Sequence, residues 1–206
     1  MSNFIVSKAA VLGAGVMGAQ IAAHLVNAGV QVVLYDLPAP AGDRSAIART
    51  AIAGLQKLDP PPLALPELAG YIVPANYEDD LEKLAACDLV IEAIAERQEW
   101  KAALYQRIAP HLAANAILAS NTSGLSIAGL AEALPAERRA RFCGVHFFNP
   151  PRYMQLVELI AAPASDPGML DALETWLVTR LGKSIVRALD TPNFIANRIG
   201  VYSIFK

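Results

Sequence analysis

The chain has few of the residues that mark secreted or metal-binding proteins. Among its 206 residues there are two cysteines and three histidines. Cys87 and Cys143 lie far apart and do not form the CxxC spacing of a zinc or redox site. The sequence therefore predicts neither a disulfide framework nor a metal site. We expect both thiols to be small core residues in a reducing compartment.

Clustered charge and long apolar runs are also absent from the sequence. The net charge is −2 and the basic residues are scattered, so we expect neither nucleic acid nor an anionic membrane as a partner. No window approaches the roughly 18 uninterrupted apolar residues of a membrane span. The first residues, MSNFIVSKAAVLG, show no targeting signal. A composition of 54% hydrophobic residues predicts a globular, cytoplasmic protein.

Short apolar runs alternate with longer amphipathic ones, which is typical of a Rossmann-type α/β fold with a mostly parallel, doubly wound sheet. The proline-rich segment 59–67 is expected to be a surface connection. Expected strands are Ala9–Leu12, Val30–Tyr35, Tyr71–Val73, Leu89–Glu92, Ala116–Ala119, Phe142–Val145, Leu156–Ile160 and Ser184–Ala188. Expected helices are Met17–Ala28, Asp43–Leu58, Glu78–Ala86, Gln98–Leu112, Ile127–Leu134 and Pro167–Leu181.

The first expected strand runs into a glycine loop, GAGVMG, and the second ends in an acidic residue. This G-x-G-x-x-G pattern in a strand–helix–strand frame predicts dinucleotide binding, with the pyrophosphate at the helix N-terminus. A carboxylate at the end of the second strand would bind the adenosine ribose and repel a 2′-phosphate, which favours NAD over NADP. The expected cofactor contacts are Gly13, Gly15, Val16, Met17, Gly18 and Asp36.

A histidine and a glutamate interrupt two neighbouring apolar runs in FCGVHFFNPPRYMQLVELI. His146 follows an expected strand, and the tetrapeptide SNTS, residues 120–123, follows another, so both should emerge where ligands bind in such sheets. Glu158 could reach the imidazole, fix its tautomer and make it a general base. A structural histidine at a strand end is the alternative that these residues leave open.

Six motifs together resemble the L-3-hydroxyacyl-CoA dehydrogenase family in order and spacing: AVLGAGVMGAQIA, LVIEAIAE, LASNTSGLSI, GVHFFNPP, LVELI and DTPNFIANRIG. The resemblance covers essentially the whole chain. It implies an NAD-binding domain over residues 1–190 and the start of a helical domain at 191–206, so we expect a part of a longer protein. The chain is most similar to the dehydrogenase portion of multidomain bacterial fatty-acid oxidation proteins, in which an enoyl-CoA hydratase-like domain can follow.

The resemblance also implies a reaction. His146 would take the proton of the 3-hydroxyl of an acyl-CoA while the hydride passes to NAD, and Glu158 would orient the imidazole. Ser123 and Asn197 would bind the reacting oxygen or position the histidine. The helical domain would close over the substrate and form a homodimer.

Further roles follow from the same resemblance. Glu96 and Lys101 match positions that contact the nicotinamide half of the cofactor, and Asn149 matches a position beside the nicotinamide ring. Few basic residues follow Asp36 where the family often holds the CoA phosphates. The candidates for that role are Arg44, Arg49 and Lys57.

Two other functional classes remain as alternatives. One is a nucleotide-binding or structural protein without turnover, although it would not need all four catalytic residues. The other is an NADP-dependent 3-hydroxy acid or 6-phosphogluconate-type dehydrogenase, which Asp36 and the HFFNP segment disfavour. Structural roles are expected for His24, His111, Trp100 and Trp176, whereas Tyr153 and Met154 could line an acyl channel.

Overall fold

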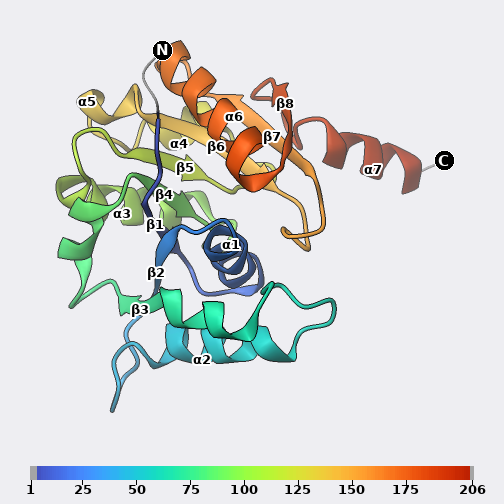
Figure 1. The fold of residues 1–206 in the computed structure, drawn as a ribbon. Coiled ribbons are helices and arrows are strands. Elements are labelled where there is room, and N and C mark those ends of the chain that lie inside the picture. Colours follow the sequence, from blue (N-terminus) through green and yellow to red (C-terminus); the bar gives the residue numbers. More distant parts are fainter. Residues whose placement is uncertain (1–3, 205–206) are drawn as a thin grey trace.

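The computed structural model describes residues 4–204, and the strands within them form one eight-stranded sheet (Figure 1). The spatial order is β3-β2-β1-β4-β5-β6-β7-β8. Neighbouring strands pair in parallel except β6 and β7, which are antiparallel. The predicted mostly parallel Rossmann-type sheet is therefore confirmed. The strands are β1 Lys8–Leu12, β2 Gln31–Asp36, β3 Ile72–Asn76, β4 Leu89–Glu92, β5 Ile117–Ser120, β6 Phe142–Phe147, β7 Leu156–Ala161 and β8 Ser184–Ala188.

Helices cover both faces of this sheet and bury two apolar layers (Figure 1). One layer contains side chains of α1, α2 and α6, and the other contains side chains of α3 and α4. The α-helices are α1 Val16–Asn27, α2 Ala46–Gly54, α3 Gln98–Ile108, α4 Ile127–Ala131, α5 Ala136–Arg139, α6 Pro167–Leu181 and α7 Ala196–Ile204. The 3₁₀ segments are η1 Leu55–Lys57, η2 Pro66–Tyr71, η3 Leu81–Ala86 and η4 Ala109–His111.

Local sequence explains where α6 begins and ends. The side chain of Asp166 accepts a hydrogen bond from Met169 N, and Pro167 occupies the first turn, where its missing N–H does no harm. The helix ends at Gly182, which has a left-handed φ of 65°. The bounds of α6 match the predicted ones, as do those of β4 and β8.

The predicted helix Glu78–Ala86 is wrong in its first half. The side-chain oxygen of Asn76 accepts hydrogen bonds from Glu78 N and Asp79 N, both at 2.9 Å. Such an Asx turn competes with helix formation because it takes up the backbone donors. Only the 3₁₀ segment η3 follows it.

The proline-rich connection is fixed to the rest of the molecule. Asn27, at the end of α1, donates to Pro62 O and accepts from Ala64 N, both at 2.8 Å. Arg152 donates to the carbonyls of Pro61 and Leu63. The connection therefore lies against α1 and the segment that follows β6.

Both cysteines are buried and free, as the sequence predicts for core residues. Burial raises the pKa of Cys87 to about 11 and that of Cys143 to about 12, so neither thiol is a nucleophile near neutral pH. Within residues 4–204, no helix combines the length and the apolar character that a bilayer crossing requires.

Candidate active site

The glycine loop joins β1 to α1, and its first and last glycines are required by the packing of the chain itself. Gly13 has a φ of 102°, and a Cβ there would lie 2.8 Å from the carbonyl oxygen of Ala93. A Cβ on Gly18 would lie 1.8 Å from the carbonyl oxygen of Gly13. Any side chain at either position would therefore disrupt the contact between β1, α1 and β4.

Gly15 differs, because no protein atom lies within 4 Å of the Cβ that could be added there. Gly15 is also the N-cap of α1, where no side chain caps the helix and the first turn contains no acidic residue. The free N–H groups and the positive end of the helix dipole are thus open to an anion. A cofactor pyrophosphate fits this bare surface.

Asp36 ends β2 beside the loop. One carboxylate oxygen accepts from Ala14 N at 2.6 Å and the other accepts from Leu37 N at 2.7 Å. These bonds fix the carboxylate at the loop with lone pairs left for ribose hydroxyls. The ribose contact of Asp36 stays a prediction.

A cavity of about 580 Å³ connects Gly15 and Asp36 with helix α3. Its walls are mainly apolar and include Tyr77, Ile94 and Trp100. A flat, weakly polar group such as adenine suits walls of this kind. The N-terminal half of the sheet therefore presents surfaces for both the pyrophosphate and the adenosine of a dinucleotide.

His146 and Glu158 face each other across the single antiparallel pairing of the sheet. They are direct register partners in β6 and β7, and the imidazole Nδ1 lies 2.8 Å from a carboxylate oxygen of Glu158. Both side chains are buried. The sequence predicted that His146 follows its strand, whereas β6 extends to Phe147 and His146 lies inside it. Side chains directly opposite in an antiparallel pair lie close together, which accounts for the contact.

The second oxygen of Glu158 holds the start of α7. It accepts from Ile195 N and Ala196 N, both at 2.9 Å. The turn before them places Phe194 at a φ of 48°, with its ring 5.8 Å from the imidazole of His146. Glu158 therefore serves the histidine and the helix at once, a double role that sequence reasoning missed.

The other predicted site residues lie at the carboxyl edge of the sheet. Ser123 follows β5, and its carbonyl oxygen accepts from Asn197 Nδ2 of α7 at 3.1 Å. Asn149 follows β6, and its side chain accepts from Gln20 Nε2 of α1 at 3.1 Å. Gln20 was not predicted; it lies five residues after Gly15 on the same helix.

Glu96 and Lys101 lie on the segment after β4. Lys101 is almost fully buried, with its Nζ 2.6 Å from Glu92 and 3.5 Å from Glu96. Burial opposes the ionisation of Glu96, but hydrogen bonds from Thr122, Ser123 N and Gly124 N and the charge of Lys101 outweigh it, so the pKa of this carboxyl lies below its usual value. Glu92 escaped notice because it reads as the last residue of an apolar strand. A lysine nine residues later was the available signal.

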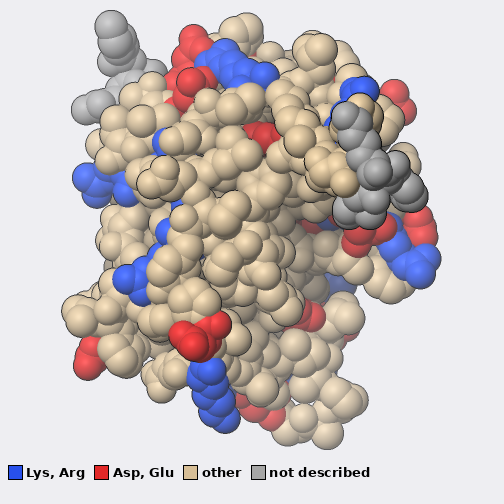
Figure 2. All heavy atoms as spheres, turned by 90° about the vertical axis from the view of Figure 1, so that its right-hand side faces the viewer, with Lys and Arg blue, Asp and Glu red and all other residues tan. Residues whose placement is uncertain are grey.

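The candidates for the CoA phosphates are less free than the sequence suggests. Arg44 pairs with Glu78 and Asp79, and Arg49 pairs with Asp43. On the face that Figure 2 presents, basic and acidic groups are interspersed around a mainly uncharged centre. Phosphates that bound these arginines would have to compete with carboxylates.

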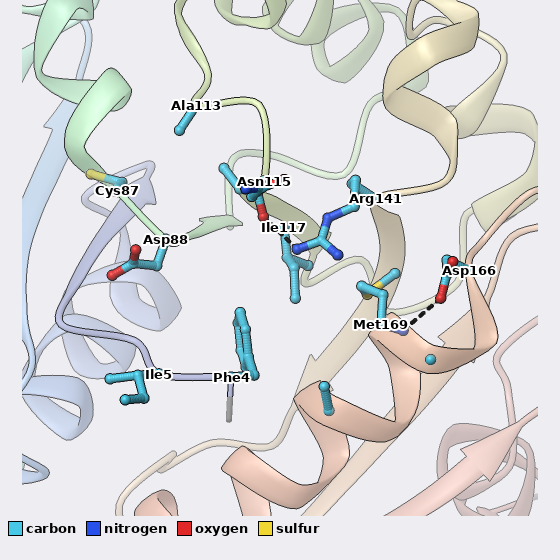
Figure 3. Close-up of a pocket in the computed structure, with 13 residues that line it drawn as sticks. Phe4, Ile5, Cys87, Asp88, Ala113, Asn115, Ile117, Arg141, Asp166 and Met169 are labelled. Carbon is cyan, nitrogen blue, oxygen red and sulfur yellow. Dashed lines mark hydrogen bonds between the residues drawn. The ribbon is translucent and has the colours of Figure 1, made fainter. Parts of the chain in front are cut away.

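A second large cavity, of about 610 Å³, lies at the amino-terminal ends of β4, β5 and β6, away from the glycine loop (Figure 3). Two of its charged side chains have partners: Asp88 accepts from Ser7 N and Lys8 N, and Asp166 caps α6. The third, Arg141, donates to the carbonyl of Asn115 from one terminal nitrogen, whereas its buried Nε has no hydrogen-bond partner among the described residues. None of the predicted site residues lines it. This cavity therefore lies apart from the predicted site.

Comparison with known proteins places this architecture in a family. Residues 8–191 match the family model described as "3-hydroxyacyl-CoA dehydrogenase, NAD binding domain". The chain is 46% identical over 198 residues to a putative fatty acid oxidation complex trifunctional enzyme of Rickettsia felis, covering 96% of this chain and 28% of that protein. It is 41% identical to a probable 3-hydroxyacyl-CoA dehydrogenase of Deinococcus radiodurans, covering 98% of this chain and 58% of that protein.

A solved structure agrees with these matches. The 3-hydroxybutyryl-CoA dehydrogenase of Escherichia coli K12 superposes with a TM-score of 0.80 at 34% identity, covering 95% of this chain and 41% of that one. The family model confirms NAD as the predicted cofactor. The chain spans only 28% and 58% of the length of the two relatives named above. The chain belongs to the 3-hydroxyacyl-CoA dehydrogenase family and corresponds to its NAD-binding domain.

Proposed function

We propose that the protein containing this chain oxidises L-3-hydroxyacyl-CoA to 3-ketoacyl-CoA in fatty-acid β-oxidation. The observation that carries this proposal is the buried pair of His146 and Glu158 beside the carboxyl edge, where the glycine loop also lies. A histidine whose Nδ1–H is held by a carboxylate presents Nε2 as the basic nitrogen.

In this reaction Nε2 of His146 removes the proton of the 3-hydroxyl group. Glu158 holds the ring in one tautomer and stabilises the imidazolium that results. Bound NAD supplies the hydride acceptor. Ser123 and Asn197, joined by a hydrogen bond, orient the reacting oxygen or the imidazole, and Asn149, Glu96 and Lys101 contact the nicotinamide half.

The partners of the whole protein are part of the same proposal. The substrate is an acyl-CoA, and a helical domain that begins at residue 191 forms a homodimer and closes over it. The family match ends at residue 191, which supports a boundary after residue 190. Two Rickettsia relatives are named trifunctional enzymes, which supports a fused enoyl-CoA hydratase-like domain. We place the protein in the cytoplasm.

A direct test measures the oxidation of NADH by the whole protein that contains this chain, with acetoacetyl-CoA as the substrate, because we expect the 206-residue chain alone to be weakly active or inactive. Turnover that disappears in His146→Gln supports the proposed reaction, because that change removes the base and keeps a polar side chain. Turnover that persists at the original rate in His146→Gln contradicts it. A folded protein that binds NADH but never turns over acetoacetyl-CoA favours the alternative of a nucleotide-binding protein without catalysis.

The cofactor site has its own test in the contrast between two glycines. Gly15→Ala should weaken NADH binding by about tenfold or more with little change in melting temperature, because its methyl group meets the pyrophosphate and no protein atom. Gly18→Ala should unfold the protein, since its methyl group overlaps Gly13. Gly54→Ala, in α2 with open space around it, is the matched control. Equal NADH affinity in Gly15→Ala and wild type, by calorimetry, would contradict this site.

A further inference from the structure

Glu92 is a fully buried carboxylate at the end of β4. One of its oxygens accepts from Lys101 Nζ at 2.6 Å and from Ile94 N at 2.8 Å. The other accepts from the hydroxyls of Tyr105 and Ser120, both at 2.7 Å. A carboxylate offers about four acceptor positions, so Glu92 is saturated by donors from β5, α3 and the segment after β4.

Stability alone is a weak reason for such a pair. Removing two charges from water is costly, and well-packed apolar residues often stabilise a core as well or better. The charge of Glu92 therefore needs a reason beyond the packing of β4, β5 and α3. The next contact of Lys101 provides one.

The ammonium of Lys101 connects Glu92 with a carboxylate at the surface. Lys101 Nζ lies 3.5 Å from Glu96, whose side chain is 43% exposed, while that of Lys101 is 1% exposed. Lys101 also lies 3.4 Å from the carbonyl of Ile94. Glu92 therefore holds the ammonium group of Lys101 in the protein interior, within reach of the partly exposed Glu96.

Glu96 in turn gathers the loop after β5. One oxygen accepts from the hydroxyl of Thr122, from Ser123 N at 2.8 Å and from Gly124 N at 3.1 Å. The same loop receives Asn197 through the carbonyl of Ser123. A continuous series of polar contacts thus leads from the core to the residue proposed to bind the reacting oxygen.

We infer that Glu92 is a positioning residue of the dehydrogenase site, acting through Lys101 and Glu96 on the loop that carries Ser123. The inference rests on the proposed cofactor contacts of Lys101 and Glu96. Its consequence is that the position of the loop depends on a buried charge, so a neutral side chain of the same shape at residue 92 should impair the cofactor site of a folded protein.

The experiment is a double-mutant cycle read by NADH affinity. Glu92→Gln keeps the shape and one acceptor oxygen but removes the charge, and it should weaken NADH binding by about tenfold. Lys101→Met should weaken it by a similar factor. The double variant E92Q/K101M should bind NADH like Lys101→Met alone, since both changes interrupt one series of contacts and their effects do not add.

The NADH affinity, measured beside the melting temperature, separates positioning from packing. A merely structural role of Glu92 would lower the melting temperature of Glu92→Gln and leave its NADH affinity unchanged. Tyr105→Phe is the matched control, because it removes one donor to the same carboxylate without touching Lys101. It should lower the melting temperature and leave NADH affinity within about twofold.

Two results would overturn the inference: Glu92→Gln binding NADH like the wild type, or losses that multiply in E92Q/K101M. If Glu92→Gln alone does not fold, the comparison of E92Q/K101M with Lys101→Met decides, and a further loss of about tenfold counts against it. The wild-type assay with acetoacetyl-CoA keeps the proposed function separate. Absent turnover there, with the predicted cycle in NADH affinity, counts against the reaction only.

Discussion

Two buried glutamates, Glu92 on β4 and Glu158 on β7, belong to the same sheet but have different partners. Both are at most 1% exposed. Glu92 faces the permanent cation of Lys101 and two hydroxyls. Glu158 faces an imidazole and two backbone N–H groups.

The two glutamates differ in the role that we propose for the partner of each. Under our inference, the contact of Lys101 with Glu92 holds a loop in place. Under the proposed reaction, the contact of His146 with Glu158 supports proton transfer, a role for which histidine is the common side chain. One buried glutamate would thus position a loop, and the other would take part in turnover.

The largest expected effect is on turnover, and it follows from a change to the pair of His146 and Glu158. Glu158→Gln should lower kcat by about 10²–10⁴-fold, because the imidazole loses the carboxylate that fixes its tautomer. The carbonyl of glutamine can still accept from Ile195 N and Ala196 N, so the melting temperature should change little. The measurement is steady-state kinetics with acetoacetyl-CoA beside a thermal melt. A large loss of stability with a normal kcat would show that Glu158 stabilises the fold and does not support turnover.

Changes to the pair of Glu92 and Lys101 should alter the free energy of unfolding. Glu92→Gln should lower the free energy of unfolding by about 3–5 kcal/mol, since it removes the buried carboxylate partner of Lys101 and leaves only Glu96, which is 43% exposed and 3.5 Å away. E92Q/K101M should recover much of that loss, because the buried ammonium is also removed. Urea unfolding of the single and double variants measures both. If the double variant were less stable than Glu92→Gln, the pair would contribute packing rather than charge.

His24 extends the comparison to a buried titratable group whose surroundings disfavour its charged form. Burial, followed by the charge of Lys183, lowers the pKa of His24 from 6.5 to about 4. The unfolded chain therefore takes up a proton between about pH 6.5 and 4 that the folded protein excludes, and stability falls as the pH falls through this window. His24→Leu should remove about 3 kcal/mol of that loss at pH 4. Urea unfolding at pH 7 and pH 4 tests this, and equal acid losses in both proteins would contradict it.

The smallest effect is expected for an ion pair of the same chemistry at the surface. Arg49 and Asp43 lie 2.6 Å apart, but their side chains are 62% and 46% exposed. Water and salt screen such a pair. Arg49→Ala should leave the melting temperature within the error of a calorimetric scan. A clear drop would show that burial is not what distinguishes the pair of Glu92 and Lys101.

The sequence predicted those elements whose cause lies within a few residues of the chain. The glycine loop, Asp36 and the ends of α6 follow from turn, cap and periodicity rules that act over a few residues. His146 and Glu158 were expected as partners because neither belongs alone in an apolar run. Glu158 lies inside its strand as expected, whereas His146 was expected to follow its strand and lies within β6, because no local signal marks that extension.

Features that depend on distant segments were not predictable in this way. The hydrogen bond between Gln20 and Asn149 joins residues 129 positions apart. The failed helix at Glu78 had a local cause, the side chain of Asn76, which a search for Asx turns could have found. The role of Glu92 was hidden because a charged residue at a strand end is usually solvated, whereas here α3 covers it.

The two bonds of Glu158 make one carboxylate a shared support for the imidazole and for the beginning of α7. Thermodynamic linkage is reciprocal: whatever orders the first turn of this helix also orders the imidazole, and whatever fixes the imidazole steadies the helix. Asn197 lies in that same first turn and binds the loop of Ser123. The placement of α7 and the orientation of the His146 imidazole are therefore coupled, and a protein in which the helix is displaced loses both together.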